Sequence, residues 1–184
     1  MHGRQGRIEV ICGSMFSGKS ERLVSRLDRA MRYEKRRVIA FKHASDVRYH
    51  DTYIGCHGGL QFPARPVLDP KDIETVAVDY EVVGIDEGQF FNSDLVAACT
   101  RMADAGKRVI IAGLDLDSQG NPFPPMPALM AVAELVKKQH AVCVACGDEA
   151  SRSYHKIGKD TVIEVGAAQY EARCRKCFNE GGFK

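Results

Sequence analysis

The chain has 184 residues, a length that predicts one domain or one domain with a small appendage. Apolar residues make up 45% of it and charged residues 27%, which is the composition of a globular protein and excludes a disordered one. The net charge of +2 gives no reason to expect a nucleic acid as partner. Residues 1–7 lack the apolar core of a signal peptide, and runs such as 109–114 are too short to span a bilayer, so we expect a cytosolic protein without a membrane partner.

The first part of the chain predicts a strand, a helix and a second strand. The strand covers residues 7–12, the helix about 18–34 and the second strand 37–42. Such a unit implies two parallel strands joined by a right-handed crossover. Residues 43–66 have no clear periodicity, and we expect a long loop or an irregular hairpin there, a kind of segment that often carries function.

The rest of the chain continues to alternate between strands and helices. Asp69 and Pro70 predict a helix start, with Asp69 as N-cap and the helix running to about residue 78. A strand is expected at 81–86, then a helix capped by Ser93 or Asp94 and closed by Gly106, and a strand at 108–114. A loop at 115–127 precedes a helix whose apolar face would contain Leu129, Met130, Val132, Ala133 and Val136. A strand near 140–144 and short strands near 151–156 and 161–165 complete the expected elements. The pattern predicts an α/β fold with a parallel sheet.

The most informative motif has the form Gly-x-x-x-x-Gly-Lys-Ser and consists of Gly13, Ser14, Met15, Phe16, Ser17, Gly18, Lys19 and Ser20. It lies between a predicted strand and a predicted helix, the setting that a phosphate-binding P-loop requires. In such a loop, backbone N–H groups surround the phosphate oxygens, the lysine reaches the β- and γ-phosphates, and the serine hydroxyl can bind Mg²⁺. The alternative is an ordinary Gly/Ser turn, which this setting disfavours.

An acidic pair follows the third predicted strand. Asp86 is placed to hold Mg²⁺ through water, and Glu87 would face the crevice at the carboxyl end of the sheet. A carboxylate there can accept the proton of an attacking hydroxyl group as a general base. The spacing alone does not separate this role from that of a solvated acid at a strand end. For Phe90 and Phe91, core packing is the favoured interpretation of at least one ring.

Two Cys-x-x-Cys pairs lie near the end of the chain and contain Cys143, Cys146, Cys174 and Cys177, with 27 residues between the pairs. Four thiolates suit tetrahedral Zn²⁺ and leave no open position, so we expect a structural zinc site, with a redox dithiol as the alternative. We interpret the other three cysteines as small buried apolar residues: Cys12, Cys56 and Cys99. We divide the chain into a nucleotide-binding domain, 1–139, and a zinc-binding domain, 140–184.

Together, the P-loop, the segment Ile85-Asp86-Glu87-Gly88-Gln89-Phe90-Phe91 and the cysteine pairs closely resemble the zinc-containing, cytosolic type of thymidine kinase, and Tyr170-Glu171-Ala172-Arg173-Cys174-Arg175 does so as well. The resemblance extends from about residue 7 to 178. It implies a RecA-like P-loop NTPase core with a parallel sheet, a small zinc-ribbon or lasso domain, and a homotetramer. It also implies that ATP and thymidine, with Mg²⁺, give ADP and thymidine 5′-monophosphate.

The resemblance also assigns roles to individual residues. Glu87 would be the general base, and the phosphate and Mg²⁺ site would comprise the P-loop with Asp46, Arg48, Asp86 and Gln89. Residues about 162–170 would form a lasso over the nucleoside. The base pocket and lasso would comprise Met15, Phe90, Leu114, Ser118, Val162, Ile163, Glu164, Val165, Gly166 and Tyr170. Zinc would hold the lasso rigid without entering the chemistry.

Three positions depart from the pattern of the resemblance. Ser118 stands where the family has a large aromatic residue, the stretch 166–170 is one residue shorter, and His43 replaces an expected proline or other residue. A serine at position 118 removes a ring beside the base, which could weaken thymidine binding or admit a bulkier base. These departures concern nucleoside selectivity more than phosphoryl transfer.

Two other functions remain open at the level of sequence. The first is a P-loop ATPase whose zinc ribbon binds DNA or RNA, but basic and acidic residues largely balance within 147–177, whereas a binding ribbon should be basic. The second is a nucleotide-binding regulatory protein that has lost turnover. The intact Lys19, Ser20, Asp86 and Glu87 argue against it. We therefore expect an enzyme with no nucleic-acid partner.

Overall fold

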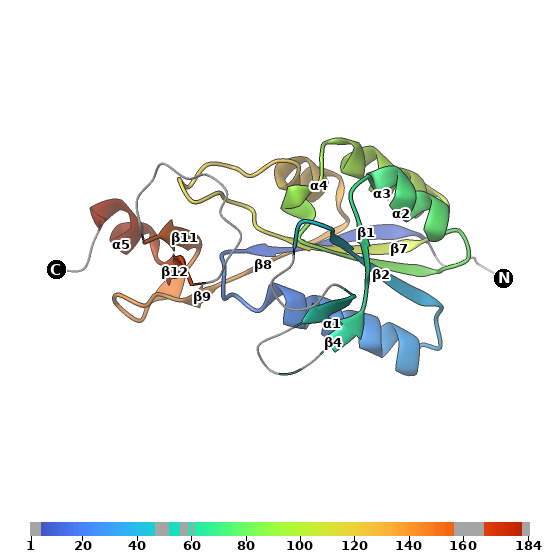
Figure 1. Cartoon of the computed structure of the whole chain (residues 1–184), viewed down its shortest axis with the longest axis horizontal. Helices are drawn as coiled ribbons and strands as arrows, with labels where there is room; N and C mark the ends of the chain where they lie inside the picture. Colours follow the sequence, from blue (N-terminus) through green and yellow to red (C-terminus); the bar gives the residue numbers. More distant parts are fainter. Residues whose placement is uncertain (1–4, 47–51, 56–58, 60, 157–167, 182–184) are drawn as a thin grey trace.

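The computed structural model describes residues 5–46, 52–55, 59, 61–156 and 168–181. Its centre is a six-stranded sheet in which every neighbouring pair of strands is parallel. The strand order is β5 (Arg65–Val67), β2 (Val38–His43), β6 (Val82–Asp86), β7 (Arg108–Gly113), β1 (Arg7–Gly13) and β8 (Leu135–Gln139), as Figure 1 shows in part. The expected α/β fold with a parallel sheet is confirmed.

Helices cover both faces of this sheet. One face carries α1 (Lys19–Arg32) and a small antiparallel hairpin, β3 (Tyr53–Gly55) with β4 (Gln61–Pro63). The other face carries α2 (Pro70–Val76), α3 (Asp94–Asp104) and α4 (Met126–Val132) (Figure 1). Because the central strands are buried on both faces, their sequences are almost continuously apolar rather than alternating.

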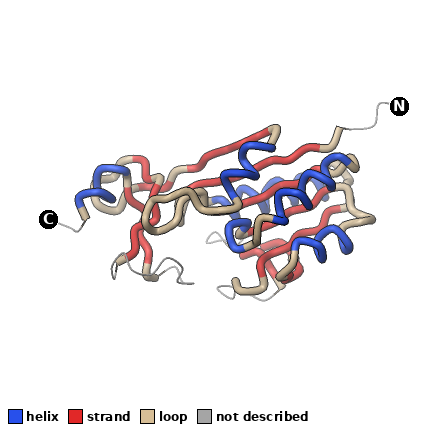
Figure 2. Tube along the Cα trace, turned by 90° about the horizontal axis from the view of Figure 1, so that it is seen from above, coloured by secondary structure: helices blue, strands red, loops and turns tan. Residues whose placement is uncertain are grey.

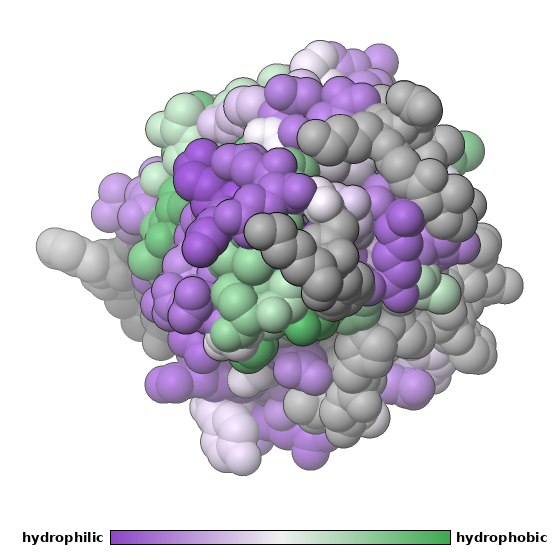
Figure 3. Space-filling model, turned by 90° about the vertical axis from the view of Figure 1, so that its left-hand side faces the viewer, coloured by the Kyte–Doolittle hydropathy of each residue, from purple (hydrophilic) through white to green (hydrophobic). Residues whose placement is uncertain are grey.

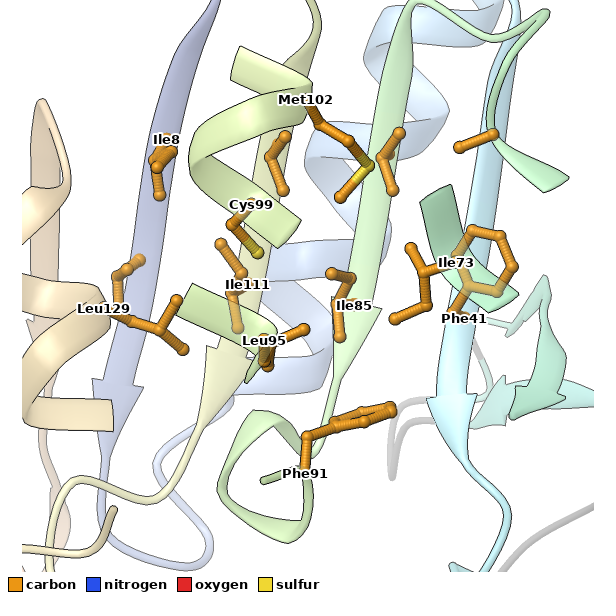
Figure 4. Close-up of a cluster of buried hydrophobic side chains, with 14 of the residues drawn as sticks. Ile8, Phe41, Ile73, Ile85, Phe91, Leu95, Cys99, Met102, Ile111 and Leu129 are labelled. Carbon is orange, nitrogen blue, oxygen red and sulfur yellow. The ribbon is translucent and has the colours of Figure 1, made fainter. Parts of the chain in front are cut away.

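The two faces contain separate apolar clusters. Figure 4 shows the cluster under α2, α3 and α4, where Leu95 and Cys99 of α3 point toward Ile85 and Ile111 of the sheet. On the opposite face, α1 contributes Leu23, Val24, Leu27 and Ala30 to the second cluster. These clusters hold the strands in register, so their carboxyl ends meet at one edge.

A smaller group of elements, formed by residues 141–156 and 170–180, lies beyond that edge (Figures 1 and 2). It contains two antiparallel pairs and a short helix: β9 (Ala141–Val142) with β10 (Glu149–Ala150), β11 (Arg152–His155) with β12 (Tyr170–Arg173), and α5 (Arg175–Glu180). Its apolar cluster is small and includes cysteines as well as alanines. A core of that size contributes little to the free energy of unfolding, so a bound metal ion would add stability that these elements lack.

Several local predictions are confirmed. The Asp69 side chain accepts a hydrogen bond from the Lys71 N–H at 2.9 Å, and Pro70 begins α2. Gly106, with φ of +86°, follows α3 as expected of a helix-closing glycine. Ser93 is the N-cap residue of α3, one of the two expected positions, but its side chain makes no capping hydrogen bond. The Asn92 side chain accepts one from the Asp94 N–H instead, at 2.9 Å.

The largest correction concerns the stretch after α4. The sequence predicts one helix that includes Val136, but α4 ends at Val132 and Val136 lies in β8. Residues 135–139 pair with β1 in parallel register, and this ladder of tertiary hydrogen bonds outweighs the local helical spacing. The strand expected near 140–144 is therefore shorter, β9, and the strand expected near 161–165 lies outside the described residues.

The irregular hairpin expected as one alternative within residues 43–66 is confirmed in the part that the structure describes. It is the β3–β4 hairpin, and β5 directly afterwards adds an edge strand to the sheet. In the described part of the chain, none of the helices combines the length and the apolar character that crossing a membrane requires.

Candidate phosphoryl-transfer site

The phosphate loop connects β1 to α1 and depends on glycine at both ends. Gly13 has φ of +144°, and a Cβ atom there would lie 2.2 Å from the Gln139 carbonyl oxygen, a distance that the backbone could not accommodate. Gly18 has φ of +77°, in the left-handed region, and leads directly into α1. The first and sixth positions of the motif are therefore glycine for steric reasons.

Two side chains of the motif form hydrogen bonds to the backbone of the loop itself. The Lys19 ammonium group donates to the Ser14 carbonyl oxygen at 2.7 Å, and the Ser17 hydroxyl donates to the same oxygen at 2.8 Å. Lys19 is only 9% exposed. The arrangement places a buried cation and the start of α1 around one loop, which is suitable for binding an anion.

Ser20 and the acidic turn meet at the same edge of the sheet. The Ser20 hydroxyl donates to both carboxylate oxygens of Asp86, at 3.0 and 3.2 Å. Asp86 is the last residue of β6 and is 5% exposed. The pair joins α1 to the end of β6, two strands away from β1 in the sheet, and offers hydroxyl and carboxylate oxygens of the kind that Mg²⁺ prefers.

Glu87 has a conformation that is unusual for its residue type. Its φ and ψ are 54° and 44°, in the left-handed region, and its side chain is 7% exposed. Non-glycine residues in this region carry strain and occur often at functional sites. The Gln89 amide group donates to Glu87 Oε2 at 2.5 Å, while Gln89 Oε1 accepts from the Leu114 N–H at 2.9 Å. Gln89 thus links the carboxylate to the end of β7.

Asp46 lies near this edge, in the turn after β2, and is 6% exposed. Its carboxylate is 3.6 Å from the ammonium group of Lys42, a buried lysine whose register partner in β6 is Asp86. Arg48, the other half of the predicted phosphate-contacting pair, lies outside the described residues.

The residues expected around the base are only partly described. Met15, Ser118 and Tyr170 are buried, and the Phe90 and Tyr170 rings contact histidines, with centroids 6.0 Å from His43 and 5.0 Å from His155. The lasso residues lie outside the described residues: Val162, Ile163, Glu164, Val165 and Gly166. A shared base pocket therefore remains a prediction.

Phe91 packs in the main core at 4% exposure and meets the His43 ring edge-on with a centroid distance of 4.8 Å. The expectation that at least one of the two phenylalanines is a core residue is confirmed. His43 is half-buried by this packing, and the burial lowers the pKa of its imidazole.

The cysteine pairs form a compact cluster. The Sγ atoms of Cys143, Cys146, Cys174 and Cys177 all lie within 4.8 Å of one another. The Cys146 and Cys174 sulfurs are 3.7 Å apart, close to the roughly 3.8 Å edge of a tetrahedron with Zn–S bonds of about 2.3 Å. The Cys177 N–H donates to the Cys174 sulfur at 3.4 Å, an interaction that favours the thiolate. The four residues could hold a zinc ion.

Two of the remaining cysteines are buried apolar residues, as predicted. Cys12 and Cys99 are each 0% exposed, and burial raises the pKa of their thiols to about 11 and about 12. Such thiols stay protonated and unreactive at neutral pH. Cys56 lies outside the described residues.

Figure 3 shows the end of the molecule that carries the cysteine cluster. Hydrophilic residues surround a smaller apolar area there, and the exposed apolar residues of this part of the chain include Val142 and Val144. The described residues of this end include both acidic and basic side chains, such as the ion pair of Lys156 with Glu171. This mixed surface does not favour a basic strip for a nucleic-acid backbone.

Sequence reasoning missed three residues that contact this site. The Gln139 amide group donates to the Ser17 carbonyl oxygen at 2.8 Å, Ser153 Oγ accepts from the Met15 N–H at 2.9 Å, and Lys42 approaches Asp46. Gln139 and Ser153 are more than 120 positions from the loop residues that they contact, and neither belongs to a motif. Lys42 falls in a predicted strand without a distinguishing pattern, so no signal in a single sequence identifies any of them.

Comparisons with known proteins show the family of the chain. The model of the family described as "Thymidine kinase" matches residues 6–178. A thymidine kinase of Bacteroides thetaiotaomicron is 47% identical over 95% of this chain and 88% of its own length. Thymidine kinases of Bdellovibrio bacteriovorus and a Rhodothermus species are 49% and 48% identical, over 95% and 96% of this chain and 86% and 83% of their own lengths.

Proposed function

Because the chain belongs to the thymidine kinase family, we propose that it transfers the γ-phosphoryl group of ATP to the 5′-hydroxyl group of thymidine, giving ADP and thymidine 5′-monophosphate. The observation that carries the proposal is the Ser20–Asp86 contact, which joins the phosphate loop to the strand end that bears Glu87. The reaction would supply thymidine nucleotide from the free nucleoside for DNA synthesis.

The phosphate side of the reaction uses the loop, Lys19 and the Ser20–Asp86 pair. The Met15 N–H donates to Ser153, so other backbone N–H groups of residues 13–20 and the Lys19 ammonium group would bind the phosphate oxygens, with Lys19 leaving the Ser14 carbonyl to do so. Ser20 and Asp86 would hold Mg²⁺, which when bound neutralises charge on the β- and γ-phosphates. Asp46 and Arg48 would complete the phosphate site, as the family resemblance implies.

Glu87 is the general base of this proposal. Its carboxylate accepts the proton of the 5′-hydroxyl group as the oxygen forms its bond to the γ-phosphorus, and the bond from that phosphorus to ADP breaks. The strained backbone and the hydrogen bond from Gln89 fix the carboxylate, so little reorganisation is needed when the substrate binds. Gln89 orients the Glu87 carboxylate and takes no part in the proton transfer itself.

The four-cysteine cluster would hold a structural zinc ion. With four thiolates there is no open coordination position, so the metal stabilises the fold of the C-terminal elements and takes no part in phosphoryl transfer. We propose that residues 140–184 form this zinc-binding unit and residues 1–139 the nucleotide-binding domain. The residues that follow β11, together with Tyr170, Met15, Phe90, Leu114 and Ser118, would enclose the thymine base.

The family resemblance also supports a cytoplasmic homotetramer. Light scattering on the purified protein tests the assembly, since a tetramer has about four times the 20.3 kDa of one chain. A monomer or dimer in that measurement would contradict this part of the proposal and leave the reaction untouched.

The decisive experiment is a coupled assay of ADP release with Mg-ATP and zinc-loaded protein. Thymidine is compared with deoxyuridine, deoxycytidine, deoxyguanosine and single-stranded DNA. Fastest turnover with thymidine, and little ATP hydrolysis without nucleoside, supports the kinase. Faster turnover with another nucleoside would leave the proposed mechanism in place and would indicate that the pocket around Ser118 has a different nucleoside selectivity. Stimulation by DNA alone would refute the proposal in favour of a nucleic-acid ATPase.

A further inference from the structure

Among the residues that the structure describes, Lys42 is the most deeply buried lysine, with a side chain only 2% exposed. It lies in β2, outside the P-loop, and the proposed phosphoryl transfer does not use it. A buried ammonium group loses its hydration, and a protein retains such a charge where neighbouring groups compensate it. The groups around Lys42 therefore indicate its role.

The strand pattern places Lys42 beside Asp86, on the face of the sheet that α1 covers. Ala40 of β2 and Val82 of β6 belong to the apolar cluster under α1. Because side chains alternate along a strand, Lys42 and Asp86 lie on the same face as these residues. The two are also register partners in neighbouring strands. The apolar rows on this face thus end in a cation and an anion, at the edge where the phosphate loop lies.

A second carboxylate approaches Lys42 from the turn after β2. Asp46 Oδ2 lies 3.6 Å from Lys42 Nζ, and the Asp46 N–H donates to the His43 carbonyl oxygen at 2.9 Å, which folds the chain back toward the strand. Asp46 and Asp86 are both buried. Two buried carboxylates thus adjoin one buried ammonium group.

This arrangement has an electrostatic consequence for the turn. Two carboxylates in a site with little solvent repel each other, and each has lost hydration. Asp86 is fixed by β6, whereas Asp46 lies in a turn and could relieve the repulsion by rotating toward solvent. The Lys42 ammonium group offsets the negative charge and attaches the Asp46 carboxylate to the sheet.

We propose that Lys42 is a positioning residue that holds Asp46 beside Asp86 and so prepares the two carboxylates for the Mg²⁺ that accompanies the nucleotide. Lys42 needs to touch neither the metal ion nor the substrate. Carboxylates that are already in place need less reordering when the Mg-nucleotide binds, so Lys42 contributes to the affinity that Mg²⁺ adds. This inference rests on the proposed use of Mg-ATP as phosphoryl donor.

The test compares three variants at this pair with the unaltered protein. Lys42→Met keeps an unbranched side chain and removes the charge, and Asp46→Asn removes the other charge of the pair. The double variant removes both, so neither charge is left buried without the other. Lys107→Met is the matched control. Lys107 is half-buried, and its ammonium group donates to three backbone carbonyl oxygens of the segment 77–80, at 2.7 to 2.9 Å, before β6 begins at the opposite edge of the sheet.

Calorimetry gives the dissociation constant of ADP with Mg²⁺ and again with EDTA, and the ratio of the two constants is the gain in affinity that Mg²⁺ provides. We expect Lys42→Met and Asp46→Asn each to lower this gain about tenfold, which is about 1.4 kcal/mol. The constant in EDTA should change less than about threefold, because the phosphate loop is untouched. The double variant should lose no more than about twofold beyond Asp46→Asn, because Lys42 acts through Asp46. Lys107→Met should lower the melting temperature and leave the gain from Mg²⁺ as it is.

Several outcomes would overturn this inference. They are an unchanged gain from Mg²⁺ in Lys42→Met, an equal loss of ADP affinity with and without Mg²⁺, and a fall of the gain in Lys107→Met as large as in Lys42→Met. A loss in the double variant equal to the product of the two single losses would also overturn it, since the two residues would then act independently.

Two failures remain distinguishable from these outcomes. If Lys42→Met does not fold, the double variant and Asp46→Asn still decide, because equal gains from Mg²⁺ in these two support the inference and a further tenfold fall in the double variant refutes it. If the unaltered protein does not phosphorylate thymidine, the proposed function fails. The ADP titrations then still decide the role of Lys42, because they need no nucleoside.

Discussion

Replacing Glu87 by glutamine tests the central chemical claim with little disturbance of the structure. The two side chains have nearly the same shape, and a glutamine oxygen can still accept the hydrogen bond that Gln89 donates at 2.5 Å. The left-handed backbone at this position is equally strained for both residues. The substitution therefore removes the ability to accept a proton and leaves the packing and the link to Leu114 in place.

The expected loss follows from the role assigned to the carboxylate. General-base catalysis contributes about 10²- to 10⁴-fold, and we expect Glu87→Gln to lower kcat at least about a hundredfold, or about 2.7 kcal/mol in the activation barrier. Glu87 is 7% exposed, so solvent has little access to the position of the missing base. Binding of Mg-ADP should change less than about threefold, because the loop and the Ser20–Asp86 pair are untouched.

The assay is ADP release with thymidine under saturating Mg-ATP, with Mg-ADP binding measured separately. Glu81→Gln is the matched control, since Glu81 directly precedes β6 whereas Glu87 directly follows it, and its carboxylate contacts Arg36 and Arg37 on the surface. Turnover of Glu87→Gln within about fivefold of the unaltered protein would refute the assignment. A comparable loss in Glu81→Gln would show that charge in general matters, and not this base.

Three further substitutions test the fold around the site. Cys146→Ser should reduce bound zinc and lower the melting temperature, because four thiolates supply the metal; full zinc content with unchanged melting would contradict the structural role. Gly84→Ala would place a Cβ atom 2.6 Å from a methyl carbon of Leu27, so it should lower the free energy of unfolding by about 1–3 kcal/mol in urea titrations, and by less in a Leu27→Ala background. Burial lowers the pKa of His43, so the folded protein favours the neutral imidazole. Its contribution to the free energy of unfolding is complete above about pH 6.5 and is lost as the pH falls from there through the lowered pKa. His43→Gln should therefore lose less stability than the unaltered protein over that window, and parallel acid titrations of the two proteins would rule this out.

Local chemistry in the sequence determined most of the site. Gly13 and Gly18 could be recognised because only glycine suits their backbone angles, and Lys19, Ser20 and Asp86 because an anion and Mg²⁺ require those groups at fixed points of a strand–loop–helix unit. The cysteine cluster followed from the spacing of the two pairs, since two cysteines with two residues between them can both bind one metal ion. The apolar runs predicted the parallel sheet, because strands buried on both faces contain few polar residues.

Tertiary structure alone decided the features that depend on contacts distant in sequence. Val136 has a local pattern compatible with a helix, and only the unpaired edge of β1 makes residues 135–139 a strand. Gln139 and Ser153 contact the phosphate loop because β8 and β11 bring them there, and their local sequence gives no sign of it. Periodicity and motifs report the preferences of a short segment. The position of a single side chain against a distant loop depends on how the whole sheet and the cysteine-bound elements pack.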